Sequence, residues 1–409
     1  MDAFTPQTVL AAYLDCRKRK RGTLNAIAFE QHLSSNLVSL TKSLNDGSYY
    51  PGSSICFVVR NPKPREVFAA DFRDRIVHHL LVRKLEQYWE KVFIYDSYAC
   101  RKGKGTLAAV DRLAHFIRSI TRNGSRQAYF LQCDIKSFFM SIDKEILWKL
   151  LVKGLERQSG KEEPKAFRDL LRKVLMHCPT TDFKNKSSEK LWAKVPPEKS
   201  LFFAPDGKGL PIGNLTSQFF ANVYMNVLDQ FVKHVLKVKY YIRYVDDFIL
   251  LSEDLQQLKT WLERIKIFLQ EELKLNLKQI SKVASLSSGI NFLGYIQHVH
   301  YRLVRRRVTF TFRRTLRRVK NKYVCNNVTG KTRRMTWSTL IRTRSVLCSY
   351  LAYISHANGK RGFKAALSRH RSWVNRYFTI SSIKAAIYPK LILKRKFEIL
   401  DTYNLSFST

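Results

Sequence analysis

The feature that most constrains the fold is a pair of adjacent acidic residues between two apolar runs, in the sequence YYIRYVDDFILLS at residues 240–252. The flanking β-branched and aromatic residues favour strands, so the pattern predicts a tight β-hairpin with Asp246 and Asp247 at its turn. Two carboxylates this close repel each other unless a cation lies between them, and their oxygen atoms suit Mg²⁺. A solvent-exposed acidic turn without a ligand is the alternative interpretation.

The charge of the chain points to a polyanionic partner. Its 409 residues include 73 lysines and arginines against 32 aspartates and glutamates, which gives a net charge of +41. A hydrophobic content of 45% indicates a folded protein with a large core. So large a positive charge predicts binding of nucleic acid. An anionic membrane surface is the competing partner, but no amphipathic basic helix or long apolar span stands out, so we expect no membrane association.

Cysteine usage and the N-terminal residues favour a reducing compartment. The seven cysteines are scattered and form no CxxC pair, so neither a zinc site nor a disulfide framework is expected. The first residues show no charged start followed by an apolar stretch, so no secretory signal is evident. We therefore expect a cytoplasmic protein.

Apolar periodicity predicts the main helices at 74–91, 106–120 and 255–273, and short strands on both sides of a turn at 61–64, at 128–134 and around 290–295. The strand at 128–134 would carry Asp134 at its tip. Asp143 follows nine residues later and is interpreted as a helix cap, because the sequence from Lys144 onward continues as a helix.

Two segments differ from the rest of the chain. Residues 155–205 are polar and rich in lysine and glutamate, which suggests a peripheral insertion. Residues 301–409 contain 26 lysines and arginines against 2 aspartates and glutamates, so this quarter of the chain carries more than half of the net charge. The pattern VRRRVTFTFRRTLRRVK predicts a helix with one basic and one packed face, in a separate helical domain. A solvated run of charge is the alternative.

The acidic residues at the two predicted strand ends suit one kind of chemistry. Adding a nucleotide to a growing nucleic acid uses two divalent cations, one at the attacking 3′-hydroxyl and one at the leaving pyrophosphate. These cations need carboxylates from at least two backbone elements. Asp134 together with Asp246 and Asp247 meets that requirement if their strands are neighbours in one sheet.

Four motifs, in the same order as in the family, make the chain resemble a reverse transcriptase: DIKSFF at 134–139, GLPIGNLTSQ at 209–218, YVDD at 244–247 and NFLGY at 291–295. In that family they are the first catalytic strand, the loop and helix beneath the templating base pair, the signature hairpin and the primer-gripping strand. The resemblance implies an RNA-directed DNA polymerase with an α+β right-hand fold of fingers, a palm built on an antiparallel sheet, and a helical thumb. The expected regions are a basic helical extension at 1–60, fingers at 61–130, a palm at 131–300 with the insertion at about 155–205, and a basic thumb that binds RNA at 301–409.

The resemblance also implies ligands and site residues. The expected catalytic residues are Asp134, Asp246 and Asp247, and these three with Ile135 are the expected metal ligands for two Mg²⁺ ions, for which Mn²⁺ can substitute. The expected substrate-binding residues are Arg65, Arg101, Phe139, Ile212, Gly213, Ser217 and Gln218. The two arginines would hold phosphates through bidentate contacts, and Phe139 would stand against the ribose 2′-hydroxyl. Ordinary surface cations, core filling and helix capping are the alternatives for these residues. The expected partners are template RNA, the cDNA/RNA duplex and deoxynucleoside triphosphates.

One departure from the common motif narrows the resemblance. Most reverse transcriptases have Gln-Gly where this chain has Ile212-Gly213, and many have Ser-Pro where it has Ser217-Gln218. The form IGNLTSQ, with SYACRKGKGT at 97–106 and RDRIVHHLL at 73–81, resembles the enzymes of diversity-generating retroelements. Those enzymes copy a template-repeat RNA into cDNA, misincorporate opposite adenine and work with a small basic oligomeric accessory protein. Because Ile212 has no amide to hydrogen-bond the nucleotide or its template base, a mispair would leave fewer buried donors unpaired.

Several alternatives share parts of this pattern. A retron-like or phage-defence reverse transcriptase has the same catalytic core, and a nearby imperfect repeat differing at adenines would distinguish a diversity-generating element. A group II intron maturase is less favoured, because no DNA-endonuclease segment is recognisable after the thumb. A catalytically silent RNA-binding protein of the same fold is disfavoured by the three intact aspartates, Asp134, Asp246 and Asp247.

Overall fold

The structure of the chain is a computed structural model, which describes residues 3–18, 22–60, 63–159, 164–279, 281–323, 335–358, 360–381 and 390–393. The basic residues 19–21, the first half of the turn at 61–64 and most of the C-terminal tail after residue 381 lie outside the described residues. The chain forms two compact units. The first comprises Met1–Gly105 and Tyr129–Val283, and the second comprises Thr106–Ala128 and Ala284–Thr409.

The first unit begins with helices that pack around one long helix. They are α1 (Pro6–Arg17), α2 (Leu24–Glu30), α3 (Leu33–Asn45) and α4 (Phe72–Val92). The Asp71 carboxylate caps α4 by accepting a hydrogen bond from the Arg73 amide at 3.1 Å. Apolar residues such as Ile76 and Leu81 are fully buried on α4. The predicted helix at 74–91 is therefore confirmed.

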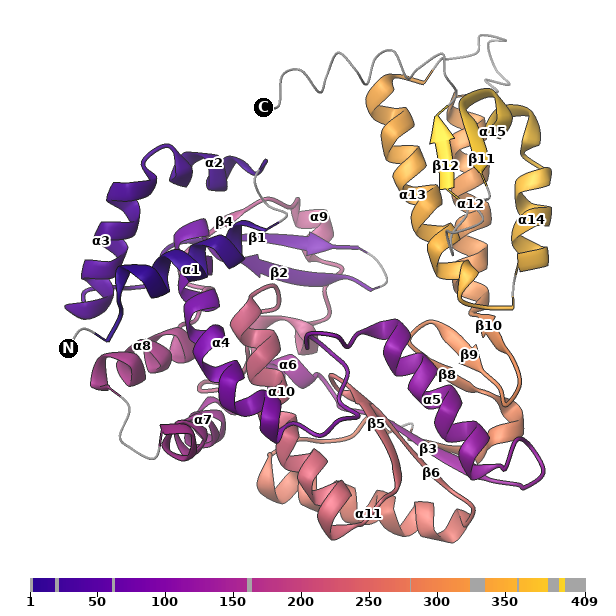
Figure 1. Ribbon diagram of the computed structural model, residues 1–409, viewed down its shortest axis with the longest axis horizontal. Coiled ribbons are helices and arrows are strands. Elements are labelled where there is room, and N and C mark those ends of the chain that lie inside the picture. The colour runs from indigo at the N-terminus through magenta and orange to yellow at the C-terminus, as the bar shows by residue number, and fades with distance from the viewer. Residues whose placement is uncertain are drawn as a thin grey trace. The chain divides into compact units, whose positions relative to one another are not determined.

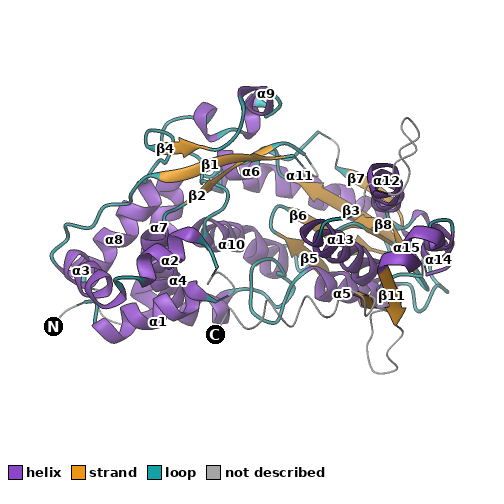
Figure 2. Ribbon diagram, turned by 90° about the horizontal axis from the view of Figure 1, so that it is seen from above, coloured by secondary structure: helices purple, strands orange, loops and turns teal. Residues whose placement is uncertain are grey.

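A small three-stranded sheet lies beside these helices, with β1 (Ser54–Val59) between β2 (Arg65–Ala69) and β4 (Phe183–Asn185) (Figure 2). β1 and β2 are antiparallel, as predicted on either side of the turn, with Cys56 opposite Phe68. β4 pairs with β1 in parallel, with Ser54 opposite Phe183. The segment at 155–205 thus contributes a strand to this sheet.

The remainder of the segment at 155–205 is also structured. It contains the end of α7 (Lys144–Ser159), α8 (Lys165–Met176) and α9 (Glu189–Trp192), followed by the short 3-10 turns Pro197–Lys199 and Leu201–Phe203. Four apolar residues of α8 are buried, at positions 167, 170, 171 and 175. Asp143 caps α7, because its carboxylate accepts from the amides of Glu145 and Ile146, both at 3.0 Å. The helix cap predicted at Asp143 is confirmed.

A four-stranded sheet has the order β5 (Tyr240–Tyr244), β6 (Asp247–Ser252), β3 (Tyr129–Asp134) and β7 (Lys282–Ser285), and all of it except the second half of β7 belongs to the first unit. β5, β6 and β3 are antiparallel neighbours, and α11 (Leu255–Glu272) packs against β3 and β6 (Figure 1). The short α6 (Phe138–Ser141) follows β3, and α10 (Leu215–Gln230) packs on α4 and α7. Twelve of the sixteen residues of α10 are buried, and five of these are polar: Thr216, Ser217, Asn222, Asn226 and Asp229.

The second unit combines one helix from the middle of the chain with the C-terminal elements. These are α5 (Thr106–Ile120), β8 (Ile290–Phe292), β9 (Tyr295–Gln297), β10 (Arg302–Val304), α12 (Arg306–Tyr323), α13 (Trp337–Ser355), α14 (Lys360–Ser368), α15 (Arg371–Tyr377), β11 (Phe378–Ser381) and β12 (Lys390–Leu393) (Figure 1). On α12, Phe312, Leu316 and Val319 are buried, whereas the arginines 306, 307, 313, 314, 317 and 318 are exposed. The prediction of one packed and one basic face is confirmed.

The prediction of one strand around 290–295 is wrong in detail, because the chain reverses there. Leu293 and Gly294 both have positive φ angles, of 47° and 91°, and join β8 to β9 as a two-residue hairpin turn. Tyr353 of α13 donates a hydrogen bond to the Leu293 carbonyl at 3.0 Å and stacks on Tyr295 with ring centroids 4.4 Å apart. Two adjacent left-handed residues are therefore fixed by a tyrosine from a distant helix.

The described helices include none with the length and apolar character needed to cross a membrane. The mixture of helices with mainly antiparallel sheets fits the α+β right-hand fold that the sequence predicted.

Candidate active site

The acidic pair lies at the end of the β5–β6 hairpin, as predicted. Tyr244 pairs with Asp247, so Val245 and Asp246 form a two-residue turn. Val245 has a φ of +57°, which is rare for a β-branched residue and costs on the order of 1–3 kcal/mol. Such strain persists only where the surrounding structure holds it in place, and it is common at functional sites.

The register of the sheet brings the third aspartate to the same place. β3 and β6 pair with Asp134 directly opposite Asp247, so both carboxylates belong to neighbouring strands at one end of the sheet. The condition set by the sequence, that the two strands be neighbours, is met. The carboxylate of Asp247 accepts a hydrogen bond at 3.1 Å from the side-chain amide of Gln132, which lies two residues before Asp134 on β3.

The electrostatics of these carboxylates show an excess of negative charge. Burial, and then the nearby charge of Asp134, raise the pKa of Asp246 to about 6. On Asp134, Oδ2 pairs with the Lys278 ammonium group, whereas Oδ1 is shielded from solvent and has no donor within the described part of the chain. The Lys278 amide also donates to the Asp134 carbonyl at 2.8 Å, which fixes the strand end.

These features fit a divalent cation at Asp134 and Asp246. An oxygen without a donor and a carboxylate with a raised pKa are both stabilised when a cation binds, and carboxylate oxygens are the ligands that Mg²⁺ takes. Among the described residues, no three acidic, histidine or cysteine side chains are already gathered as a metal-binding group. Ile135 is fully buried and its side chain is a hydrocarbon, so its predicted role as a metal ligand concerns its main-chain oxygen and stays a prediction.

A buried arginine that the sequence analysis did not single out supports the hairpin from behind. Arg243 on β5 is fully buried, and all five of its N–H groups donate: two to Asp229 at 2.8 and 2.6 Å, and one each to the Asn222 side chain, the Ser97 hydroxyl and the Val245 carbonyl. The bond to Val245, at 2.9 Å, holds the strained turn. An arginine within an apolar strand was the available signal, but its partners are distant in sequence.

The motif at 209–218 packs against β2. The Ile212 carbonyl accepts from the Phe68 amide at 2.8 Å, and the Asn214 side chain accepts from the Ala70 amide at 3.3 Å. Gly213 has a φ of +125°, and a Cβ atom there would lie 2.7 Å from the Phe68 carbonyl oxygen. Only glycine fits this close approach, which places the loop before α10 against β2 between the main-chain bond at Ile212 and the side-chain bond of Asn214.

The other predicted substrate residues have varied surroundings. Phe139 on α6 is half-buried against the ring of Phe138, with centroids 5.3 Å apart, and its carbonyl accepts from the Leu210 amide. On α10, Ser217 is buried and Gln218 is exposed. Their predicted contacts with nucleotide or duplex are not tested by these positions and stay predictions.

The two predicted phosphate-binding arginines differ from each other. Arg65 is exposed at the start of β2. The Arg101 side chain is only 6% exposed, pairs with Glu90 at 3.0 Å and donates to the carbonyls of Ile94 and Ser97. These contacts give Arg101 a role in holding the loop after α4, and its predicted contact with phosphate stays untested.

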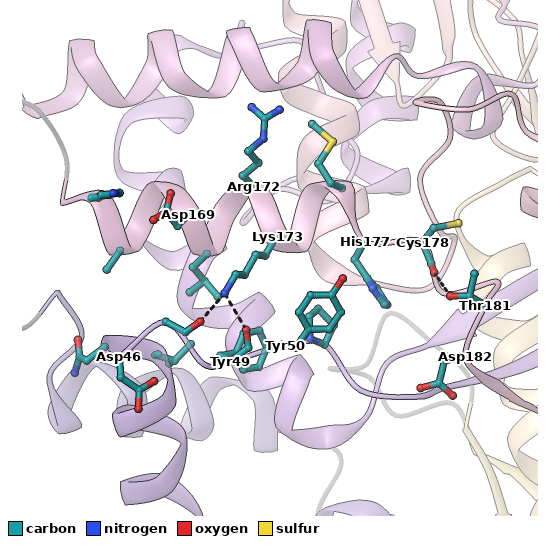
Figure 3. Close-up of a pocket in the computed structure, with 18 residues that line it drawn as sticks. Asp46, Tyr49, Tyr50, Asp169, Arg172, Lys173, His177, Cys178, Thr181 and Asp182 are labelled. Atoms are coloured by element: carbon teal, nitrogen blue, oxygen red, sulfur yellow. Dashed lines mark hydrogen bonds between the residues drawn. The ribbon is translucent and has the colours of Figure 1, made fainter.

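A cavity of about 950 Å³ lies away from these residues, between the end of α3 and α8 (Figure 3). Lys173 crosses it and donates to the carbonyls of Gly47 and Tyr49, at 2.6 and 3.4 Å. None of the predicted site residues lines this cavity. Its lysine therefore ties α8 to the loop after α3, and the acidic hairpin remains the candidate active site.

Comparison with known proteins decides the family. The family profile "Reverse transcriptase (RNA-dependent DNA polymerase)" matches residues 60–297, more than half of the chain. The chain belongs to the reverse transcriptase family. This match contains all three aspartates, Asp134, Asp246 and Asp247.

Individual relatives of this reverse transcriptase are distant. It is 26% identical over 188 residues to an uncharacterized 91 kDa protein in the cob intron of Schizosaccharomyces pombe, a match of 46% of this chain and 19% of that protein. The chain therefore spans about a fifth of the length of this curated relative. Among solved structures it is similar to apo telomerase from Candida tropicalis (TM-score 0.45, 12% identity, 62% of this chain and 55% of that one). It is also similar to telomerase from Candida albicans in complex with a fragment of telomeric RNA (TM-score 0.44, 11% identity, 85% and 60%).

Proposed function

We propose that this reverse transcriptase extends a DNA primer on an RNA template at the site formed by Asp134, Asp246 and Asp247. The observation that carries the proposal is the register of β3 and β6, which sets Asp134 opposite Asp247 beside a turn that contains Asp246. Divalent cations held by Asp134 and Asp246, with Mg²⁺ as the proposed metal, would activate the primer hydroxyl and neutralise the leaving pyrophosphate.

The residues of the chain position the reacting groups. The Lys278 amide and the β3–β6 pairing hold the Asp134 end of the strand, and Arg243 holds the turn through the Val245 carbonyl. Rigid placement of this kind lowers the barrier, because phosphoryl transfer depends on alignment and on charge stabilisation. Phe139, half-buried on α6, is the proposed gate that favours deoxynucleotides.

Primer extension with Asp246→Asn tests the proposal. Because the amide cannot replace a carboxylate as a metal ligand, cDNA synthesis should fall at least about 10³-fold, the scale of losing one main electrostatic element of a site. Asp254→Asn is the matched control, since Asp254 only caps α11 and asparagine caps equally well. Wild-type synthesis by Asp246→Asn would exclude this site.

A finer proposal is that the enzyme belongs to a diversity-generating retroelement and copies its template inaccurately at adenine. The support is the sequence IGNLTSQ, in which Ile212 replaces the usual glutamine, and the position of Ile212 and Gly213 at the start of α10. A small basic accessory protein is the proposed partner. Sequencing of cDNA made by Ile212→Gln tests this: fewer errors at template adenines are expected, and an unchanged error spectrum removes Ile212 from the argument.

An intron-associated reverse transcriptase is the second candidate. The observation that favours it is the 26% identity to a protein in the cob intron of Schizosaccharomyces pombe. The RNA that copurifies with the chain distinguishes the two candidates, because an intron RNA and a template repeat differ in sequence and in genomic position.

A further inference from the structure

A groove lined by aromatic rings lies on the segment between α8 and α10, within the first unit. Its volume is about 540 Å³, and its lining residues are Phe183, Asn185, Glu189, Trp192, Val195, Ser200, Phe202 and Phe203. We call this the aromatic groove. The function proposed above uses none of these residues.

Three rings of the aromatic groove contact one another, and two of its rings, Phe202 and Phe203, are exposed. Phe202 contacts Phe183 and Trp192 with ring centroids 5.4 and 5.6 Å apart. Trp192 is oriented by its indole N–H, which donates to the Asn185 side chain at 3.0 Å. Phe203 is 69% exposed, so its ring is available to a ligand and contributes little to the core.

Four lysines lie close in sequence to residues that line the aromatic groove. Residues 183–195 contain four exposed lysines, at positions 184, 186, 190 and 194, and one acidic residue, Glu189. None of these lysines forms an ion pair with a described residue. Exposed rings between uncompensated cations are the pattern of surfaces that stack bases and bind the phosphates of a single strand.

The aromatic groove continues toward the catalytic strand. Ser200 and Phe203 also line a smaller hollow of about 280 Å³, together with Lys136 and Ser137. Lys136 is two residues from Asp134. A strand lying in the aromatic groove would therefore run along the surface that leads to the end of β3.

We propose that the aromatic groove binds single-stranded nucleic acid, with bases stacked on Phe203 and its neighbouring rings and phosphates held by these four lysines. A second copy of this chain is disfavoured, because the lysines would face an equally basic surface. That the bound strand is unpaired template rests on the proposed function, but binding itself does not.

The test is fluorescence anisotropy of the full chain with labelled 12-mers of uridine and of deoxythymidine, without nucleotides. Loss of a stacked base should weaken binding by Phe203→Ala about fivefold to a hundredfold, whereas Phe203→Tyr keeps the ring and should bind normally. Tyr50→Ala is the matched control, because Tyr50 is similarly exposed, at 66%, but lies at the cavity beside α8. The two 12-mers show whether ribose or deoxyribose is preferred.

The lysines give an independent measurement. Replacing Lys190 and Lys194 by glutamine should reduce the dependence of log affinity on log salt by about 0.7 for each phosphate that a lysine no longer neutralises. The proposal is overturned if Phe203→Ala binds both 12-mers like Tyr50→Ala, or if the salt dependence is unchanged. It is equally overturned if Phe203→Ala affects only self-association or binding to phosphatidylserine vesicles. Because this binding assay contains no nucleotides, a negative result refutes the aromatic groove as a binding site without bearing on the primer-extension test of the active site.

Discussion

Removal of the Arg243 side chain should destabilise the protein strongly. Arg243→Met leaves the fully buried Asp229 carboxylate with the Tyr241 hydroxyl, at 2.7 Å, as its side-chain donor. Loss of one partner from a buried ion pair costs about 3–5 kcal/mol, because the other charge stays buried without compensation. The whole fold is stable by only about 5–15 kcal/mol, so this one change removes a large part of it.

A double variant separates the charge from the packing. In Arg243→Met/Asp229→Asn both charges are gone, and the asparagine oxygen still accepts from Tyr241. The double variant should therefore recover part of the stability that Arg243→Met loses, with an interaction energy of about 1–3 kcal/mol between the two positions. Urea unfolding followed by circular dichroism measures the free energies of unfolding of all four proteins.

The same variants test the link between this ion pair and the hairpin. Arg243→Met removes the donor to the Val245 carbonyl, so the turn that carries Asp246 loses its support. The double variant should therefore regain stability but not the rate of primer extension. The reasoning is refuted if Arg243→Met costs less than about 1 kcal/mol, or if the double variant is less stable than the single one.

Three further results are expected. Because the pKa of Asp246 is raised to about 6, protons compete with a bound cation below that pH. The affinity for Mn²⁺, measured by calorimetry, should therefore rise from pH 5 to 7 and then level off. An affinity that does not change with pH contradicts this. Burial raises the pKa of Glu66, so the stability that its protonated form contributes is lost as the pH rises through the folded-state pKa. The melting temperature of Glu66→Gln should therefore be no lower than that of wild type at pH 7 and should change less between pH 5 and 7. A melting temperature several degrees below wild type at pH 7 would contradict this reasoning. Gly213→Ala should lower the melting temperature and stop primer extension, because the added Cβ atom would collide with the Phe68 carbonyl. Gly207→Ala is the control for backbone strain alone, because Gly207 has a φ of +71° but no atom near the position of the added Cβ. Equal losses of melting temperature in the two variants would exclude the contact with Phe68 as the cause.

The elements that the sequence predicted are those with a strong local period. The hairpin at Tyr244–Asp247, the strand that ends on Asp134 and the cap at Asp143 depend on residues close in the chain, and the structure has all three. From the sequence alone, the pairing of β3 with β6 is a requirement of the proposed metal site and not a prediction. Local patterns predict that both strands exist, but not that they pair with each other.

What the sequence did not predict depends on distant partners. β4 has only three residues, Phe183–Asn185, and two of them are polar, so no period marks it; its pairing with β1 spans about 130 positions. Lys278 and Arg243 look like ordinary cations until Asp134 and Asp229 are placed beside them. The sequence pattern places Gly294 within a single strand. The turn there is fixed by Tyr353 of α13, which no local pattern indicates.

The close contact between Gly213 and Phe68 couples the position of β2 to that of the loop before α10. The loop that begins α10 is bonded to β2 on both sides of this glycine, through the Ile212 carbonyl and the Asn214 side chain. A shift of β2 during a reaction cycle must therefore drag the start of α10 with it. A displacement at either end is therefore transmitted between segments 144 residues apart in the chain, through one main-chain hydrogen bond and one bond to the Asn214 side chain.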